Sequence, residues 1–302
     1  MPNIQTADEN IRWDLTFIYS GVGDPQIDQD LAEFSRLAAD FHQRFKGKLD
    51  ATLGQAISAY SELDMLGGKI MIYLSLLQSL DVTDDTVKAK VAEAQQAMSQ
   101  TQGEYLTFFE LEVVALEDQT LQTLYASDEV VNRHRPWIEH LRVFKPHLLS
   151  EPVEAALTKR SPFGPNAWDE FFDECEADLR FQHEGRSKNL TEMLDVLTQS
   201  KDSGQRAEAQ KLINNGLGGF FAKYSAQTLY VIVGRAAVER RERKYRHPME
   251  SRNKENRIPD AVVDSLHHAV KYVAGPLARR YYRLKAELLG MKTLKWSDRN
   301  AP

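Results

Sequence analysis

Apolar residues recur every three or four positions along most of the chain, which is the period of an amphipathic α-helix. The first series predicts a helix that ends at Gly47. A second series predicts a longer helix from about Thr52 to Leu77. Gly67 and Gly68 interrupt it, and each costs ~1 kcal/mol of helix stability relative to alanine. We therefore expect a neighbouring helix to approach closely there. The first series consists of Ile27, Leu31, Phe34, Ala38, Phe41 and Phe45.

A third series, from Val87 to Phe108, predicts the longest helix of the chain, with Asp81 or Thr83 as its cap. Shorter helices follow, and polar or proline residues mark their starts. In the last third of the chain we expect helices at 203–214 and 220–242, and another from Pro259 that Gly275-Pro276 kinks or ends. Gly290 suits the end of the last helix, where a left-handed residue is common. The residues that mark the starts of the shorter helices in the middle of the chain are Asp118, Ser127, Pro136, Ser150 and Asn166.

A strand pattern is convincing only between Asp178 and Thr191, where it predicts one small hairpin around Gly185. The segment from Ile11 to Tyr19 is expected to be an extended arm whose Trp13, Leu15, Phe17 and Tyr19 pack against a helical body. The predicted fold is therefore all-α, with one β-hairpin near residues 179–191.

The composition indicates a soluble globular protein large enough for one or two domains. The chain has 302 residues, 42% of them hydrophobic and 27% charged, and a formal net charge of −6, which argues against a general nucleic-acid binder. Neither a signal peptide nor a membrane span is evident, so no membrane partner and a cytoplasmic location are expected. The single cysteine, Cys175, excludes an internal disulfide and a cysteine-based zinc cluster.

A basic run lies between Arg235 and Arg257, where nine Lys or Arg residues stand against four Glu. One interpretation is a solvated helix end and loop with partial salt bridges. Another is the lining of a peptide groove, where arginine forks hold a carboxylate. Nucleic-acid binding fits less well, because Tyr245 is the only aromatic residue within the run.

The other chemically suggestive residues favour ordinary roles. The adjacent His267 and His268 point about 100° apart on a helix and cannot chelate one ion together as an i, i+4 pair can. Cys175 lies among Asp173, Glu174 and Glu176, which raise the pKa of a thiol and make it a poor nucleophile. The chain has no serine-hydrolase elbow, no Walker loop and no dinucleotide fingerprint.

Several separated segments together resemble the oligoendopeptidase F group of M3 zinc metallopeptidases. By this resemblance, residues 1–190 form an N-terminal helical region, in which about 108–185 is similar to the group's N-terminal domain, and residues 191–302 begin the catalytic domain. The segments are 13–15, 108–112, 146–151, 167–172, 245–249 with Arg252 and Asn256, 281–290, and 298–302.

The resemblance implies a helical enzyme with a deep channel, in which zinc activates water to cleave peptide bonds of short peptides. In the group, a His-Glu-x-x-His helix and a later Glu bind the zinc, and no His-Glu-x-x-His occurs in this sequence. We therefore expect an N-terminal half that is inactive by itself, with no catalytic or metal-binding residue of its own. Zinc would be the cofactor of the full-length enzyme only. The candidate channel-lining residues, which would bind peptide substrate, are Tyr245, Arg246, His247 and Arg252.

The alternative interpretation is a non-catalytic helical module that binds peptides or serves as a scaffold. Under the first interpretation, the apolar faces from Val262 to Leu289 would lack part of their packing surface. Low stability or self-association of the isolated chain is then expected.

Overall fold

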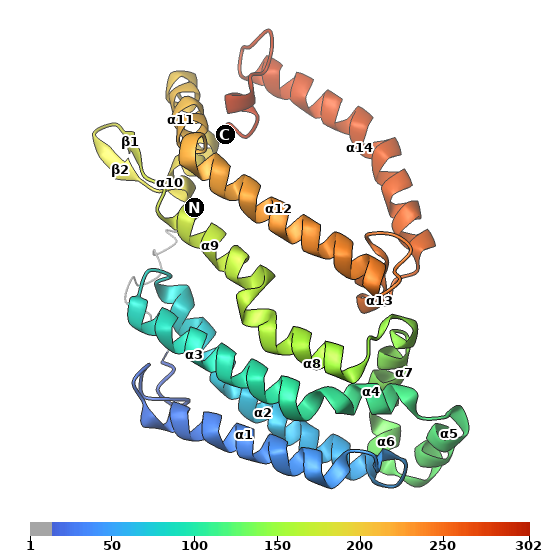
Figure 1. The fold of residues 1–302 in the computed structure, drawn as a ribbon. Coiled ribbons are helices and arrows are strands. Elements are labelled where there is room, and N and C mark those ends of the chain that lie inside the picture. The colour runs from blue at the N-terminus through green and yellow to red at the C-terminus, as the bar shows by residue number, and fades with distance from the viewer. Residues whose placement is uncertain (1–13) are drawn as a thin grey trace, which may run out of the picture. The chain divides into compact units, whose positions relative to one another are not determined.

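The computed structural model describes residues 14–302, which are assigned to two compact units (Figure 1). Among the described residues, the first unit comprises 14–141 and Ser150–Pro162, and the second comprises Arg142–Leu149 and Phe163–Pro302. The chain is helical apart from one two-stranded hairpin in the described residues, as the sequence predicted.

The first unit is built from α-helices with one π-helical interruption. Its longest helix is α2, and the π-helix lies between α3 and α4. The elements are α1 Pro25–Phe45, α2 Leu49–Leu80, α3 Asp85–Thr101, the π-helix Gln102–Leu106, α4 Thr107–Ala115, α5 Asp118–Ser127, α6 Glu129–Arg133, α7 Arg135–Arg142 and α8 Glu151–Arg160.

Aromatic rings fill the centre of the first unit. Phe41 of α1 lies edge-on to Phe109 of α4, with ring centroids 5.1 Å apart, and Tyr60 of α2 lies 4.7 Å from Phe109. The helical series predicted from the sequence is the buried face of α1, where Ile27, Phe34, Ala38, Phe41 and Phe45 are at most 3% exposed. Aromatic contacts of this kind add to the hydrophobic free energy of the core.

The glycine pair in α2 confirms the expected close approach at one position. A Cβ atom on Gly67 would lie 2.8 Å from Cε of Met98 in α3 and 3.1 Å from Cε2 of Phe34 in α1. A Cβ atom on Gly68 would meet nothing within 4 Å. Of this pair, only Gly67 lies where an added Cβ atom would crowd side chains of the neighbouring helices.

The second unit contains the hairpin and the longer C-terminal helices. In the hairpin, Gln182 pairs with Ser187, and the turn uses Glu184 at φ 52° and Gly185 at φ 75°. Positive φ values at both positions match the twist of the two strands. The elements are a 3-10 turn at Lys145–His147, α9 Pro165–Ala177, β1 Phe181–His183, β2 Arg186–Lys188, α10 Leu190–Gln199, α11 Ser203–Gly216, α12 Gly219–Glu242, α13 Glu250–Glu255, α14 Asp260–Leu288 and a 3-10 turn at Trp296–Asp298.

Two predictions about the third helix are wrong. Its cap is Asp84, whose carboxylate accepts the backbone N–H groups of Thr86 and Val87, and Asp81 instead caps the preceding turn by accepting from Thr83. The helix has 17 residues and is not the longest, since α2 has 32. The π-helix interrupts the third apolar series at Gln102.

Several predicted helix starts differ by one or two residues. Glu117, Asp128 and Gly164 precede α5, α6 and α9, in place of Asp118, Ser127 and Asn166. Ser150 does precede α8, as predicted. An acidic residue one position away competes successfully with serine, because its carboxylate can accept two backbone N–H groups, as Asp128 does.

The predicted extended arm is only partly correct. Trp13 lies outside the described residues, and residues 16–18 form a turn because Asp14 accepts hydrogen bonds from both the backbone and the hydroxyl of Thr16. The turn leaves Phe17 82% exposed, whereas Tyr19 is buried and donates a 2.6 Å hydrogen bond to Asp30.

The sequence predicted that Gly275-Pro276 kinks or ends this helix; α14 continues through Pro276, so the pair does not end it. The helix closes at Gly290, as predicted, with φ 65°. Met291 N–H donates to the Ala286 carbonyl and Gly290 N–H to the Glu287 carbonyl, the pair of bonds of a Schellman motif. Within residues 14–302, no helix combines the length and the apolar character needed to cross a membrane.

Candidate functional site

The basic loop that the sequence singled out connects α12 to α14 and contains α13. A non-glycine residue takes the left-handed conformation just after each of the two helices. Lys244 follows α12 with φ 60°, and Arg257 follows α13 with φ 55°. Tyr245 N–H then bonds to the Arg240 carbonyl, and Ile258 N–H bonds to the Asn253 carbonyl. Left-handed non-glycine residues cost about 1 kcal/mol or more each, and such backbone strain is concentrated at functional sites.

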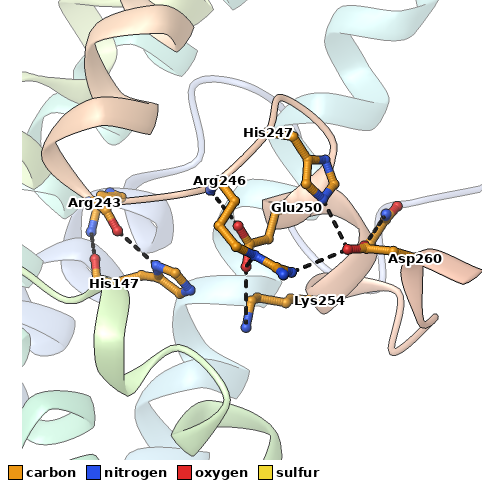
Figure 2. Close-up of polar contacts among 8 residues, drawn as sticks. His147, Arg243, Arg246, His247, Glu250, Lys254 and Asp260 are labelled. Carbon is orange, nitrogen blue, oxygen red and sulfur yellow. Dashed lines mark hydrogen bonds and ion pairs between the residues drawn. The ribbon is translucent and has the colours of Figure 1, made fainter.

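Asp260, the first residue of α14, holds the loop from one side (Figure 2). Its carboxylate lies 3.0 Å from Nε2 of His247 and 3.2 Å from Nη2 of Arg246, and it accepts a 2.9 Å hydrogen bond from Nδ2 of Asn253. The hydrogen bonds from Asn253 and His247 hold the pKa of Asp260 below its ordinary value. The carboxylate also suits the positive end of the α14 dipole.

Glu250, the first residue of α13, is a buried acid that binds Arg246 within the loop (Figure 2). Its side chain is 5% exposed and accepts from the backbone N–H of Arg246 and, at 3.1 Å, from Nε of Arg246. Nζ of Lys254 lies 3.9 Å away. Burial opposes ionisation of this carboxyl, but the hydrogen bonds from Arg246 outweigh it and keep the pKa of Glu250 low.

His147 joins a distant segment to the start of the loop. Its ring stacks on Tyr245 with centroids 4.1 Å apart, and its Nδ1 lies 2.7 Å from the Arg243 carbonyl oxygen, to which it can donate. Nη1 of Arg243 donates in return to the His147 carbonyl at 3.3 Å. The segment around Pro146 and the segment around Tyr245, which separately suggested the same family, are therefore neighbours in space.

The four predicted residues come together in this loop, but in different settings. Tyr245 is held by His147, and His247 by Asp260. Arg246 has two acidic partners, yet its side chain is 71% exposed. Arg252 is 67% exposed and has only Glu255 of its own helix, at 3.5 Å.

Glu250, Asp260 and His147 are the members of this site that sequence reasoning missed. Glu250 stands four residues after Arg246, the i, i+4 spacing of a helical ion pair, and that spacing could have indicated it. The three acids Glu250, Glu255 and Asp260 match the three cations Arg246, Arg252 and Lys254, so the centre of the loop is less positive than the basic run suggested.

Chemically, the arrangement offers two exposed cationic side chains that are hydrogen-bond donors. Two exposed guanidinium groups with neighbouring hydrogen-bond donors can hold a carboxylate or a peptide carbonyl. The acids that anchor Arg246 fix its direction. No nucleophile and base are paired in the loop.

Other candidates contribute no catalytic centre. Burial raises the pKa of the Cys175 thiol, and the charges of Asp178 and Glu174 raise it further, so this thiol is a poor nucleophile as expected. His267 and His268 are exposed on α14. Among residues 14–302, no three His, Cys, Asp or Glu side chains lie where they could hold a metal ion together.

Comparisons with known proteins confirm the expected resemblance. A family model described as oligopeptidase F matches residues 112–181. The chain is 25% identical, over 99% of its length, to Group B oligopeptidase PepB of Streptococcus agalactiae serotype III (strain NEM316), and covers 50% of that protein. It is 23% identical, over 97% of its length, to an oligoendopeptidase F homolog of Lactococcus lactis subsp. lactis (strain IL1403), and covers 49% of it.

Solved structures show the same fold. The crystal structure of oligoendopeptidase-F from Enterococcus faecium matches 92% of this chain with a TM-score of 0.79 at 22% identity, and the chain covers 56% of it. A putative peptidase from Chlamydophila abortus matches 96% of the chain with a TM-score of 0.60 at 18% identity, and the chain covers 49% of it. The chain thus spans about half the length of the curated relatives it matches most fully.

Proposed function

We propose that this chain is part of a zinc-dependent oligoendopeptidase that hydrolyses peptide bonds of short peptides. The observation that carries the proposal is the similarity to Group B oligopeptidase along 99% of the chain. The match of residues 112–181 to the oligopeptidase F model supports the same assignment from a part of the chain that precedes the basic loop in the sequence.

The zinc ion would be bound outside this chain. The described residues offer no group of ligands that fits a metal, so no step of peptide hydrolysis is assigned to them. We propose that the ligands lie in the part of the relatives' length that this chain does not span, and that the 302 residues alone do not hydrolyse peptides.

Within such an enzyme, we assign the basic loop to substrate binding. Tyr245, Arg246, His247 and Arg252 would line the channel, with the exposed guanidinium groups holding a carboxylate of the peptide. The support is the exposure of Arg246 and Arg252, the acids that orient Arg246, and the strained backbone at Lys244 and Arg257. The proposed division of roles is 1–190 for the N-terminal helical region and 191–302 for the start of the catalytic domain, in a cytoplasmic enzyme.

The test is hydrolysis of short synthetic peptides by the uninterrupted gene product, followed by mass spectrometry. We expect cleavage at internal bonds, loss of cleavage with a zinc chelator, and recovery when zinc is returned. The chain of residues 1–302, assayed in parallel, should cleave nothing. Peptide binding without hydrolysis by the zinc-loaded gene product would instead favour the non-catalytic peptide-binding module.

A further inference from the structure

Helix α14 presents one uninterrupted apolar line to solvent. The eight side chains on this line are between 52% and 78% exposed, and Ala286 is the only buried residue of the helix. Among residues 14–302, no other helix makes an extensive contact with α14. The exposure expected for this face is thus confirmed. The line consists of Val262, Leu266, Val270, Val273, Leu277, Tyr281, Leu284 and Leu288.

The spacing of the residues in this line indicates what kind of segment could pack on it. Its members follow each other by four, four and three residues, and this step pattern of eleven residues then repeats. Eleven residues in three turns is close to the ~3.6 residues per turn of an α-helix. The line therefore stays on one side of α14 from end to end, and another helix can pack along it. Most of the stability of such a helix in proteins comes from packing this kind of face.

The borders of the line carry charge at one end. Arg279, Arg280, Arg283 and Lys285 stand against Glu287 alone in the last three turns. In the described part of the chain, none of these four cations has an ion-pair partner, although Lys285 lies over the ring of Tyr281. A complementary surface would present carboxylates to this end of the helix.

A second copy of the chain meets this requirement poorly. Two parallel α14 helices would place the basic ends together. Two antiparallel helices would offer Asp260 and Asp264, but Asp260 is already bound by Arg246, His247 and Asn253. One free carboxylate cannot match four cations.

We propose that the apolar line of α14 docks an amphipathic helical segment with acidic borders, which belongs to the half of the oligopeptidase fold that this chain does not span. The relatives are long enough to include such a segment, since the chain covers only 50% of Group B oligopeptidase and 56% of the Enterococcus faecium structure. The identity of the partner rests on the proposed function, but docking requires no catalysis.

The test mixes purified residues 1–302 with the separately produced remainder of the uninterrupted gene product. Sedimentation measures complex formation, and amide hydrogen exchange measures protection of residues 260–288. We expect a complex and at least about tenfold slower exchange along α14. Because the readout is binding, a complex that hydrolyses no peptide with zinc present would contradict only the proposed function.

Two pairs of variants separate the apolar and the charged contributions. Val270→Asp with Leu277→Asp should weaken the complex at least about tenfold, whereas Leu80→Asp, at an 80% exposed position of α2, should leave it unchanged. Arg279→Glu with Arg283→Glu should weaken it several-fold and reduce its salt dependence, unlike the charge-matched Lys201→Glu with Lys211→Glu. Circular dichroism of each variant establishes that its helices persist.

Three results would overturn the proposal. They are the absence of a complex with the wild-type chain, a complex that the α14 variants do not weaken, and self-association through α14 that the added remainder does not displace. The last result would assign the face to a second copy.

Discussion

Arg206 and Asp298 form a buried ion pair between residues far apart in the sequence. Nε and Nη2 of Arg206 donate to the same oxygen, Oδ1 of Asp298, at 2.9 and 2.7 Å, and both side chains are 1% exposed. Nη1 of Arg206 donates to the Ser200 carbonyl. The pair fixes the 3-10 turn at Trp296–Asp298 against α11.

Removing one partner of this pair should be strongly destabilising. Arg206→Met leaves the Asp298 carboxylate buried without a counter-charge, which costs about 3–5 kcal/mol of unfolding free energy. Urea denaturation followed by circular dichroism measures the loss. The double variant Arg206→Met with Asp298→Leu should recover most of it, because no buried charge remains. If the double variant is as unstable as the single one, the geometry of the pair matters more than its charge.

The adjacent glycines of α2 should respond oppositely to alanine. Gly68→Ala adds a methyl group in open space and should stabilise the chain by about 0.5–1 kcal/mol through helix propensity. Gly67→Ala places a methyl group against Met98 and Phe34. The overpacking costs about 1–3 kcal/mol of unfolding free energy and outweighs the gain in helix propensity, so this variant should be destabilised. Thermal unfolding of the two variants is the measurement. Equal effects would contradict the close approach at Gly67.

Asp260 should make stability depend on pH in the acid range. Its pKa is lowered in the folded state relative to about 3.9 in the unfolded chain, so its contribution is present above that value and is lost as the pH falls through the folded pKa. Asp260→Asn should therefore lower the urea midpoint near pH 7 and show a smaller fall on acidification. Asp264→Asn, an exposed position on the same helix, is the matched control. A variant with the wild-type acid dependence would show that Asp260 is not the responsible group.

The exposed arginines of the loop should affect substrate binding in the intact enzyme. Arg246→Ala with Arg252→Ala removes two charge-assisted hydrogen-bond donors and should raise the KM for short peptides by about tenfold, equivalent to ~1.4 kcal/mol. Peptides whose C-terminal carboxylate is amidated should lose this difference. Lys201→Ala, in a loop elsewhere, tests for a general effect of charge. An unchanged KM would mean that the loop does not face the substrate.

The fold was largely predictable because helical periodicity is local information. The buried face of α1 and the hairpin at Gly185 each follow from residues close in sequence. The helix caps were harder, since Asp84 and Asp128 compete with nearby serine, threonine and other aspartate residues by small differences in hydrogen-bond geometry. The π-helix at Gln102 has no periodic signal in the sequence.

The candidate site was only half predictable. The basic run and its proline break identify the loop, but the contacts that orient it depend on long-range packing. His147 and the Arg243 carbonyl are 96 residues apart, and no local pattern joins them. The pairing of Arg246 with Asp260 likewise depends on where α14 begins.

The π-helix between α3 and α4 allows the chain to absorb a change of one residue in its length. Thr107 N–H bonds to the Gln102 carbonyl, five residues back, so this segment accommodates one residue more than an α-helix would. In a regular α-helix one added residue would rotate everything after it by about 100° around the helix axis, and the π-turn absorbs that rotation locally. A related sequence shortened by one residue here would therefore form an unbroken α-helix and keep Phe108 and Phe109 in the aromatic core. An evolving chain can thus lose a single residue between 102 and 106 more readily than it can lose one elsewhere in these helices.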